Sequence, residues 1–520
     1  MDFGSGAAGY RLARLTRRRL LGLTAGLMGG ALAGCAARGA VPRLAARGPG
    51  DPAALDDDDW FEPEVRASQN GLLETTLRAA RYEGVLVGGQ PVETILYEGT
   101  YPGPTLKVRP GDRLRIALVN DLPDAVNPVL LSRDRDDTPT GQITNLHVHG
   151  FHVSPKSPSD DVFLDIAPGT TFHYEYQIPA NHPTGTYWYH PHRHEWVAHQ
   201  IFSGMAGMII MEGALDAVPG VAGLRERSFV ITQTTIKDGK IESILKAGIG
   251  DTTLVNGRLL PTVRIRPGET QRWRLLNAAE DVFYQLELED HLLHVIAVDG
   301  NPVVSTQPMK QVVLAAGSRL DVLVQAQARG TYQLRTTSFT NYGPTIYDTA
   351  VEISPPGLIA TMACDGPDQA PAPLPTRINP DFEDLRFVPV DRQRTLTFAQ
   401  DQYPTYIPQG VYMNFYIDGV QFAPGVVNIQ TKLNSVEEWK LVNQTREFHS
   451  MHIHINPVQV VAIGDVPVEQ LWMQDVVTLP PFSSVTIRQQ FLDFTGKYVL
   501  HCHLVFHEDF GMMLVVEVVP

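Results

Sequence analysis

The chain has 520 residues, of which 43% are hydrophobic, and it contains 44 glycines and 39 prolines. This composition is typical of a folded protein with many turns and excludes a disordered chain, and the net charge of -15 argues against nucleic acid as a main partner. Three cysteines are too few for a disulfide framework, and the length allows two to four domains.

The first 35 residues have the features of an export signal, which we exclude from the fold. Three arginines at 17–19 precede a short apolar run, in a pattern that resembles a twin-arginine signal. The run ends in Leu-Ala-Gly-Cys at 32–35, which resembles the lipobox of bacterial lipoproteins, so a lipid on Cys35 would anchor the mature chain to a membrane. The alternative is an ordinary signal that is cut near residues 33–37. Both alternatives predict an exported protein, periplasmic or at the cell surface.

The next segment, residues 36–68, is rich in Ala, Gly, Pro and Asp and predicts a solvated spacer. After it, residues 106–121 alternate apolar and polar side chains on both sides of a Pro-Gly-Asp turn, as half-buried strands do. Related stretches recur at 263–278 and 426–443. Three copies of one strand–turn–strand unit predict an all-β chain of three related domains.

The domain boundaries follow from these repeats and from a Pro-rich stretch between the second and third copies. We expect Greek-key β-sandwich domains at 69–215, 216–356 and 391–520, with a linker at 357–390. Each domain is long enough to bury a core of its own.

Four motifs contain 11 of the 17 histidines: NLHVHG and WYHPHRH in the first domain, and FHSMHIH and HCHLVFHEDFGMM in the third. Each motif contains an H-x-H pair, and alternation along a strand places both imidazoles of a pair on one face. Two facing domains would surround one small volume with eight imidazoles, which are too many for one ion and predict a cluster of two or three metals such as copper, zinc, iron or nickel. These eight residues are His147, His149, His190, His192, His452, His454, His501 and His503.

The cysteine of the last motif has a different role, because alternation points Cys502 away from its two neighbouring histidines and into its own domain. A thiolate with two imidazoles and a weak thioether is the donor set of a blue-copper electron-transfer site. The first domain has Pro191 at the corresponding position, and the second has only His291 and His294, which we interpret as ordinary residues of that domain. The third domain supplies the full donor set: His449, Cys502, His507 and Met512.

The four motifs, in this order, closely resemble those of the multicopper oxidases, the family of laccases, bilirubin oxidases and ascorbate oxidase, and in particular its three-domain, laccase-like bacterial type. The resemblance extends from about residue 70 to the end of the chain. It implies three cupredoxin-like domains in a monomer that binds four copper ions. It also implies one-electron oxidation of a substrate at a type 1 copper and reduction of dioxygen to two waters at a trinuclear cluster.

The resemblance also implies a ligand set, and no ligand of the family is missing. The type 1 copper would bind His449, Cys502 and His507, with Met512 as an axial ligand that favours a low-to-moderate potential. The type 2 copper would bind His147 of the first domain and His452 of the third domain. The type 3 pair would share the remaining six: His149, His190, His192, His454, His501 and His503.

Dioxygen reduction consumes four protons, so the resemblance also implies carboxylates that serve the cluster. Glu508 follows the second type 1 histidine, where the family has an acid. The second acid would be Asp160 or Asp161, because the spacing after the first H-x-H pair departs from the commoner pattern. The alternatives are a solvated surface acid at 508 and a plain turn at 160–161. We expect Asp475 to fix a loop near the type 1 site, and Cys364, in a linker-like region, to be a free thiol.

The substrate stays open between two enzyme hypotheses. The first is a laccase-like oxidase of phenols or aromatic amines. The second is a metal oxidase for Cu(I) or Mn(II) that serves copper tolerance or metal homeostasis, but the 12 methionines are scattered rather than gathered in an insertion, which favours an organic substrate. A copper-dependent nitrite reductase would have two domains. A structural or copper-storage protein on the same fold is the alternative of another class, although storage would not need Cys502.

Overall fold

The computed structural model describes residues 60–127, 129, 138–244, 250–340, 352–354, 356–403, 405–407 and 410–520. The expected export signal, Cys35 and residues 36–59 of the expected spacer lie outside these ranges. Strands dominate the described residues, and none of the helices among them is long and apolar enough to span a membrane. The predicted all-β fold class is confirmed.

The first domain is a sandwich of two sheets around a core that contains Tyr174, Tyr176 and Tyr187. The five-stranded sheet has the order β1 (Val65–Ala67), β4 (Thr105–Val108), β11 (Gly207–Met211), β10 (Gly185–His190) and β8 (His147–His149). The six-stranded sheet has the order β13 (Ile236–Lys237), β14 (Lys240–Ile241), β3 (Gln90–Tyr97), β2 (Leu72–Val87), β5 (Arg113–Asp121) and β9 (Thr170–Gln177). A separate ribbon joins β6 (Asp124–Ala125) and β7 (Thr140–Gly141). Because β1 pairs with β4, the end of the expected spacer belongs to this domain.

The second domain repeats this architecture around a core that contains Trp273. Its six-stranded sheet has the order β15 (Thr252–Val255), β12 (Arg225–Thr234), β17 (Thr270–Asn277), β22 (Arg319–Gln325), β19 (Leu293–Val298) and β20 (Asn301–Met309). Its five-stranded sheet has the order β16 (Thr262–Ile265), β26 (Gly357–Cys364), β23 (Gly330–Thr337), β18 (Tyr284–Leu288) and β21 (Gln311–Leu314). A ribbon joins β24 (Phe339–Thr340) and β25 (Glu352–Ser354). The expected linker at 357–390 begins too early, because β26 pairs with β16 and β23 inside this domain.

The third domain has the same pair of sheets around a core that contains Trp439. Its six-stranded sheet has the order β30 (Phe415–Ile417), β27 (Arg392–Gln400), β32 (Val436–Asn443), β37 (Ser484–Gln490), β34 (Val458–Ile463) and β35 (Val466–Pro467). Its five-stranded sheet has the order β31 (Ile429–Lys432), β39 (Met513–Val519), β38 (Gly496–Cys502), β33 (His449–Ile453) and β36 (Val476–Leu479). A ribbon joins β28 (Thr405–Ile407) and β29 (Gly410–Tyr412), and the short helices of the described chain are α2 (Val197–Phe202), α4 (Val505–Asp509), η1 (Ala214–Ala217) and η2 (Leu385–Phe387).

The repeated strand–turn–strand unit has the same place in all three domains. Its first strand (β4, β16 or β31) lies in the five-stranded sheet and its second (β5, β17 or β32) lies in the six-stranded sheet. The turn needs a residue with positive φ, which is Gly111 or Gly268 in the first two copies and Asn434 in the third. Asparagine tolerates this left-handed conformation better than most residues with a side chain, so the third copy keeps the turn without glycine.

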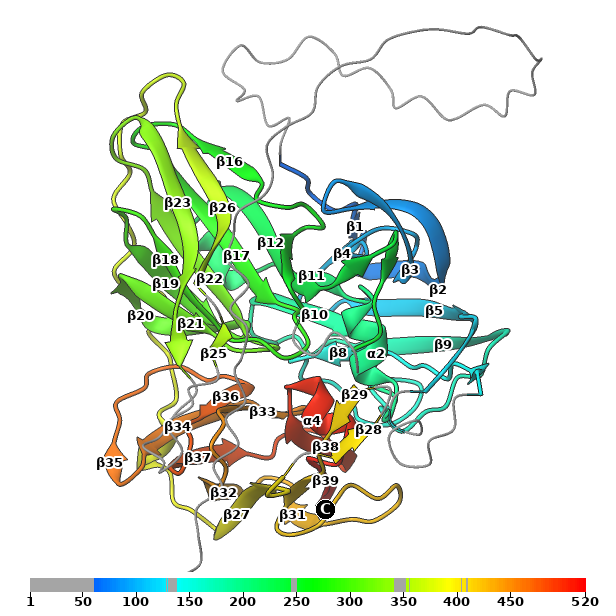
Figure 1. Ribbon diagram of the computed structural model, residues 1–520. Helices are drawn as coiled ribbons and strands as arrows, with labels where there is room; N and C mark the ends of the chain where they lie inside the picture. The colour runs from blue at the N-terminus through cyan, green and yellow to red at the C-terminus, as the bar shows by residue number, and fades with distance from the viewer. Residues whose placement is uncertain are drawn as a thin grey trace, which may run out of the picture. The chain divides into compact units, whose positions relative to one another are not determined.

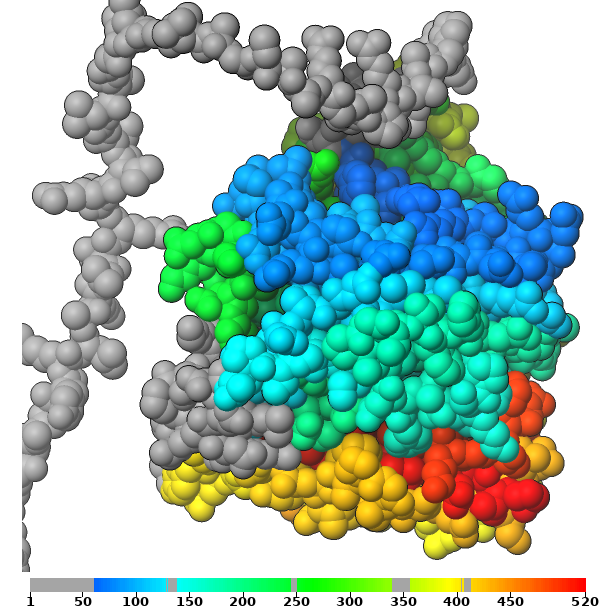
Figure 2. Space-filling view, turned by 90° about the vertical axis from the view of Figure 1, so that its right-hand side faces the viewer, coloured from blue at the N-terminus to red at the C-terminus, as the bar shows by residue number. Residues whose placement is uncertain are grey.

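The first and third domains contact each other directly. In the space-filling view, the blue-to-teal first domain lies against the yellow-to-red third domain (Figure 2). Helix α2, which follows the second histidine motif, lies beside α4, which is part of the fourth (Figure 1). The carboxylate of Asp509 accepts hydrogen bonds from the backbone N–H of Glu195 (2.6 Å) and of Ala198 (2.8 Å), so α4 caps the start of α2.

Candidate metal centres

Four strands of the two facing domains bring the H-x-H pairs together. In the first domain β8 pairs with β10, which sets His147 opposite His190, and in the third domain β33 pairs with β38, which sets His452 opposite His501. Rings of the two domains stack on each other, with His149 and His452 centroids 3.7 Å apart. All eight imidazoles are at most 2% exposed. We call these eight residues the histidine cluster, and their convergence is as the sequence predicts.

The donor nitrogens of the histidine cluster form three groups, and the nitrogens within each group lie within 4.8 Å of one another. In one group the Nε2 atom of His501 lies 3.1 Å from Nε2 of His192 and 3.3 Å from Nε2 of His454. Two nitrogens bound at about 2.0 Å to one tetrahedral ion are about 3.3 Å apart, so these spacings fit shared metals. The groups are His147, His149 and His452; His149, His190 and His503; and His192, His454 and His501.

Each cluster ring has two nitrogens. A hydrogen bond to the nitrogen on the outer side of the ring leaves the other nitrogen facing the middle of the histidine cluster. Nε2 of His147 and Nε2 of His452 are buried and have no hydrogen-bond partner among the described residues. A buried polar atom without a partner is costly, and a metal ion would satisfy both. Burial also lowers the imidazole pKa of His147 well below its usual range and that of His192 to about 4, which keeps these two rings in the neutral form that binds metals. Four rings are anchored through Nδ1: His147 to Asp160, His190 to the backbone oxygen of Pro191, His452 to that of Asp475 and His501 to that of Cys502.

Two of the three predicted acids lie against the histidine cluster. The carboxylate of Asp160 contacts Nδ1 of His147 at 2.9 Å and accepts the backbone N–H of Val148 at 3.1 Å. Asp161 instead accepts the backbone N–H of Phe163, so the structure favours Asp160 of the two alternatives. Glu508 is fully buried, with one oxygen 3.0 Å from Nδ1 of His501, and burial raises its pKa to about 7.

The prediction for Asp475 is wrong, because this residue lies at the histidine cluster. Its Oδ1 atom is 2.9 Å from Nε2 of His149, and Arg319 of the second domain binds both of its carboxylate oxygens. Sequence reasoning missed Arg319 altogether. The sequence carries only a weak indication of its role, which is the presence of two charged residues, Arg319 and Asp321, in the otherwise mostly apolar strand RLDVLVQ.

The cysteine centre, which consists of His449, Cys502, His507 and Met512, lies on the opposite side of β38. The Cys502 sulfur is 3.5 Å from Nδ1 of His449 and 3.7 Å from Nδ1 of His507, and these two nitrogens are 3.2 Å apart. Met512 is fully buried in the same core, and its backbone bonds to Cys502 and His507. Burial raises the pKa of the Cys502 thiol well above its usual range, whereas a bound cation would favour the thiolate. Strand alternation therefore predicts the direction of Cys502 correctly.

The remaining sequence expectations concern the second domain. His291 packs its ring against Tyr332 and bonds through Nδ1 to the backbone oxygen of Glu289, and His294 lies on β19. Neither belongs to a candidate metal group of the described residues. Cys364 ends β26 as a buried free thiol.

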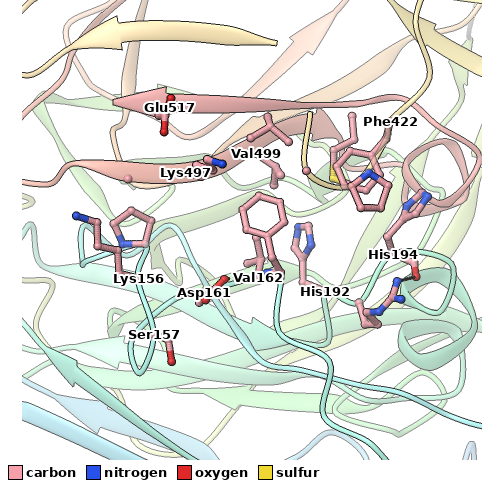
Figure 3. A pocket seen from close by; sticks show the side chains of 18 of the residues that line it. Lys156, Ser157, Asp161, Val162, His192, His194, Phe422, Lys497, Val499 and Glu517 are labelled. Atoms are coloured by element: carbon pink, nitrogen blue, oxygen red, sulfur yellow. Dashed lines mark hydrogen bonds between the residues drawn. The ribbon is translucent and has the colours of Figure 1, made fainter. Parts of the chain in front are cut away.

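A cavity of about 590 Å³ between the first and third domains extends to the histidine cluster. Figure 3 shows Val162, Val499 and Phe422 along its apolar wall and His192 beside them. Charged side chains, including Lys156 and Lys497, line another part of it. His192, a residue of the histidine cluster, therefore forms part of the wall of this cavity.

Three family models described as multicopper oxidase match residues 79–130 with 140–215, 230–351 and 387–520, and together they cover most of the chain. The chain is 25% identical over 462 residues to the multicopper oxidase mco of Staphylococcus aureus, covering 86% of this chain and 89% of the relative. It is 26% identical over 483 residues to a laccase of Bacillus stratosphericus, covering 82% and 91%.

Solved structures share the fold. A multicopper oxidase from Campylobacter jejuni, described as a metallo-oxidase, superposes with a TM-score of 0.71 at 22% identity, covering 89% of this chain and 97% of that one. McoA from Aquifex aeolicus gives 0.73 at 22%, covering 90% and 100%. The three domains are therefore cupredoxin-like, as predicted. The chain belongs to the multicopper oxidase family, whose members carry four coppers, and it is a copper-dependent oxidoreductase that uses dioxygen.

Proposed function

We propose that this protein oxidises phenols or aromatic amines at the cysteine centre and reduces dioxygen to water at the histidine cluster. Bound copper would supply the electron transfer, taking single electrons from the substrate and delivering four to dioxygen. The cysteine centre would hold one copper, His147 and His452 a second, and the other six cluster histidines a pair.

One observation carries this proposal: the two centres share a continuous piece of backbone. Cys502 belongs to the cysteine centre, and its covalent neighbours His501 and His503 belong to the histidine cluster. A copper-storage protein would gain nothing from this connection. An oxidase gains a short path between the site of substrate oxidation and the site of dioxygen reduction.

The substrate preference is supported by a carboxylate beside the cysteine centre. Glu447 has an oxygen 3.6 Å from Nε2 of His507, on the side of the ring away from Cys502, and its side chain is 32% exposed. A phenol or aromatic amine loses a proton when it is oxidised, and we assign Glu447 to accept that proton.

A metal-ion substrate is the second candidate, and it rests on a neighbour of Glu447. Burial, and after it the charge of Glu447, raise the pKa of Asp281 to about 8, so these two acids interact electrostatically. Paired carboxylates suit cations such as Mn(II). The two candidates therefore differ in whether these acids accept a proton or bind the substrate itself.

On the dioxygen side, we assign the 590 Å³ cavity that extends to His192 as the path of dioxygen. Glu508 would hold a proton between Nδ1 of His192 and Nδ1 of His501 and release it towards the cluster. Asp160 would fix the ring of His147. We also propose that the chain is exported and lipid-anchored, supported by the twin-arginine pattern and the lipobox at Cys35.

The test is oxygen uptake by the purified, copper-loaded protein with a phenol, an aromatic amine, Cu(I) and Mn(II) as parallel substrates. We expect the organic substrates to give the highest kcat/KM. Replacing Glu447 by Gln should then lower kcat/KM for the phenol and leave the visible spectrum unchanged. Uptake with metal ions alone would support the second candidate, and no uptake with any of the four would refute both.

A further inference from the structure

The second domain supplies no candidate metal ligand among its described residues, yet one of its loops contacts the histidine cluster. The backbone oxygen of Ala316 accepts a hydrogen bond from the Ser450 hydroxyl at 2.6 Å. Gly317 lies so close to His503 that an added Cβ would meet the ring at 2.8 Å, which only glycine avoids. The loop ends at Arg319, the first residue of β22. The second domain therefore forms part of the wall around the cluster.

Arg319 makes the strongest of these contacts. Its side chain is fully buried, and two of its nitrogens bind the two carboxylate oxygens of Asp475 at 2.7 and 2.6 Å. A third nitrogen donates to the backbone oxygen of Thr186 at 3.2 Å. Such a two-point pair fixes the plane of the carboxylate as well as its position, which a single point charge does not.

Asp475 transmits this constraint to one ring by its side chain and to another by its backbone. Its Oδ1 atom binds Nε2 of His149, which turns Nδ1 of His149 towards the cluster, 3.4 Å from Nε2 of His190. Its backbone oxygen accepts from Nδ1 of His452, which leaves Nε2 of that ring facing the centre. His149 is thus oriented opposite to the four rings that are anchored through Nδ1.

The backbone of Asp475 is held from the second domain as well. One carboxylate oxygen of Asp299 accepts the N–H groups of Asp475 (3.2 Å) and Val476 (3.0 Å), and the other accepts the N–H of Arg319 at 2.9 Å. Both the side chain and the main chain of Asp475 are therefore fixed by the second domain, whose described residues include no candidate ligand.

We propose that Arg319 is a positioning residue for the histidine cluster: its two-point contact with Asp475 determines which nitrogens His149 and His452 present to copper. This inference rests on the proposed function, because it requires copper in the cluster. Removing a partner that orients a metal ligand lowers metal affinity or activity by about 10–100-fold. Lysine keeps the charge but cannot bind both oxygens, so Arg319→Lys isolates the geometric contribution.

The experiment compares Arg319→Lys and Arg319→Met with a matched control, Arg272→Lys. Arg272 is equally buried, lies in the second domain and forms ion pairs with Asp216 and Asp321, without contact to a cluster residue. Each apo-protein is titrated with copper, and the visible spectrum, the electron paramagnetic resonance of the type 2 copper and the copper content are recorded.

We expect both Arg319 variants to keep the blue colour of the cysteine centre, to bind cluster copper about 10–100-fold more weakly, and to show altered type 2 hyperfine splitting. The control should match the wild type in all three measurements. A blue Arg319→Lys protein with wild-type resonance and copper affinity would overturn the inference alone. A wild-type protein without blue colour would instead refute the proposed function. If Arg319→Met does not fold, Arg319→Lys decides the question.

Discussion

The two candidate metal centres differ in how many domains build them. The cysteine centre lies within the core of the third domain, with donors on β33, on β38 and in the segment 507–512. The histidine cluster takes four imidazoles from each of two domains, and Arg319 of the second domain binds Asp475 beside it. The difference teaches that the first centre requires one folded domain, whereas the second requires the correct assembly of three. Substitutions at the domain interfaces should therefore disturb the cluster and spare the cysteine centre.

The largest expected effect comes from Cys502, whose two neighbours in the chain belong to the histidine cluster. Cys502→Ser should abolish the blue colour and the oxidation of phenols, because serine does not supply a thiolate to copper. The cluster histidines point away from this side chain, so cluster copper should remain bound. Visible spectroscopy with copper analysis measures both, and a variant that stays blue would show that the cysteine centre is assigned incorrectly.

A variant at the histidine cluster should have the opposite selectivity: it should impair the cluster and leave the cysteine centre unchanged. Asp160→Asn weakens the anchor of His147, and we expect copper affinity or dioxygen reduction at the cluster to fall by about 10–100-fold. Asp161→Asn is the matched control, since Asp161 contacts no cluster residue among the described residues. Single-turnover experiments would follow anaerobic reduction of the blue copper and its reoxidation separately. Equal effects of the two variants, or slower anaerobic reduction, would contradict the comparison.

The cavity offers a smaller and more selective effect. Val162→Phe should fill part of the space beside His192 and raise the KM for dioxygen, while the KM for a phenol stays unchanged because that substrate binds at the other centre. Steady-state oxygen uptake at varied dioxygen concentrations checks this prediction, and an unchanged KM for dioxygen would exclude the cavity as its path.

The smallest expected change concerns the axial position of the cysteine centre. Met512→Leu conserves volume, so the free energy of unfolding should change by less than about 1.5 kcal/mol. Loss of the thioether should raise the reduction potential of the blue copper, and the type 2 resonance of the cluster should not change. Redox titration monitored by the blue absorption measures the shift. An unchanged reduction potential would show that Met512 is not a ligand of the blue copper.

Local patterns predict much of this molecule because they depend on neighbouring residues. The period of two along β38 fixes the opposite directions of Cys502 and His501, and the repeated turn identifies three domains. Boundaries are harder, because β1 and β26 become strands only through partners elsewhere in the fold. The role of Arg319 was not predicted for the same reason, because its partner Asp475 lies 156 residues away in the chain.

The sequence also does not decide which of two adjacent acids in a turn contacts the histidine cluster. Asp160 and Asp161 are chemically identical, and the turn after the first histidine motif determines which one faces inwards. In the structure the backbone N–H of Val148 and Nδ1 of His147 together bind Asp160. Neither contact is encoded in the spacing alone.

The most direct test of the central claim is the copper content of the purified mature protein together with its visible and paramagnetic resonance spectra. We predict about four coppers per chain, one of them blue and one with a type 2 resonance, as the family's complement implies. A fully loaded protein that is colourless, or that binds fewer than four coppers, would contradict the division of the chain into one cysteine centre and one histidine cluster.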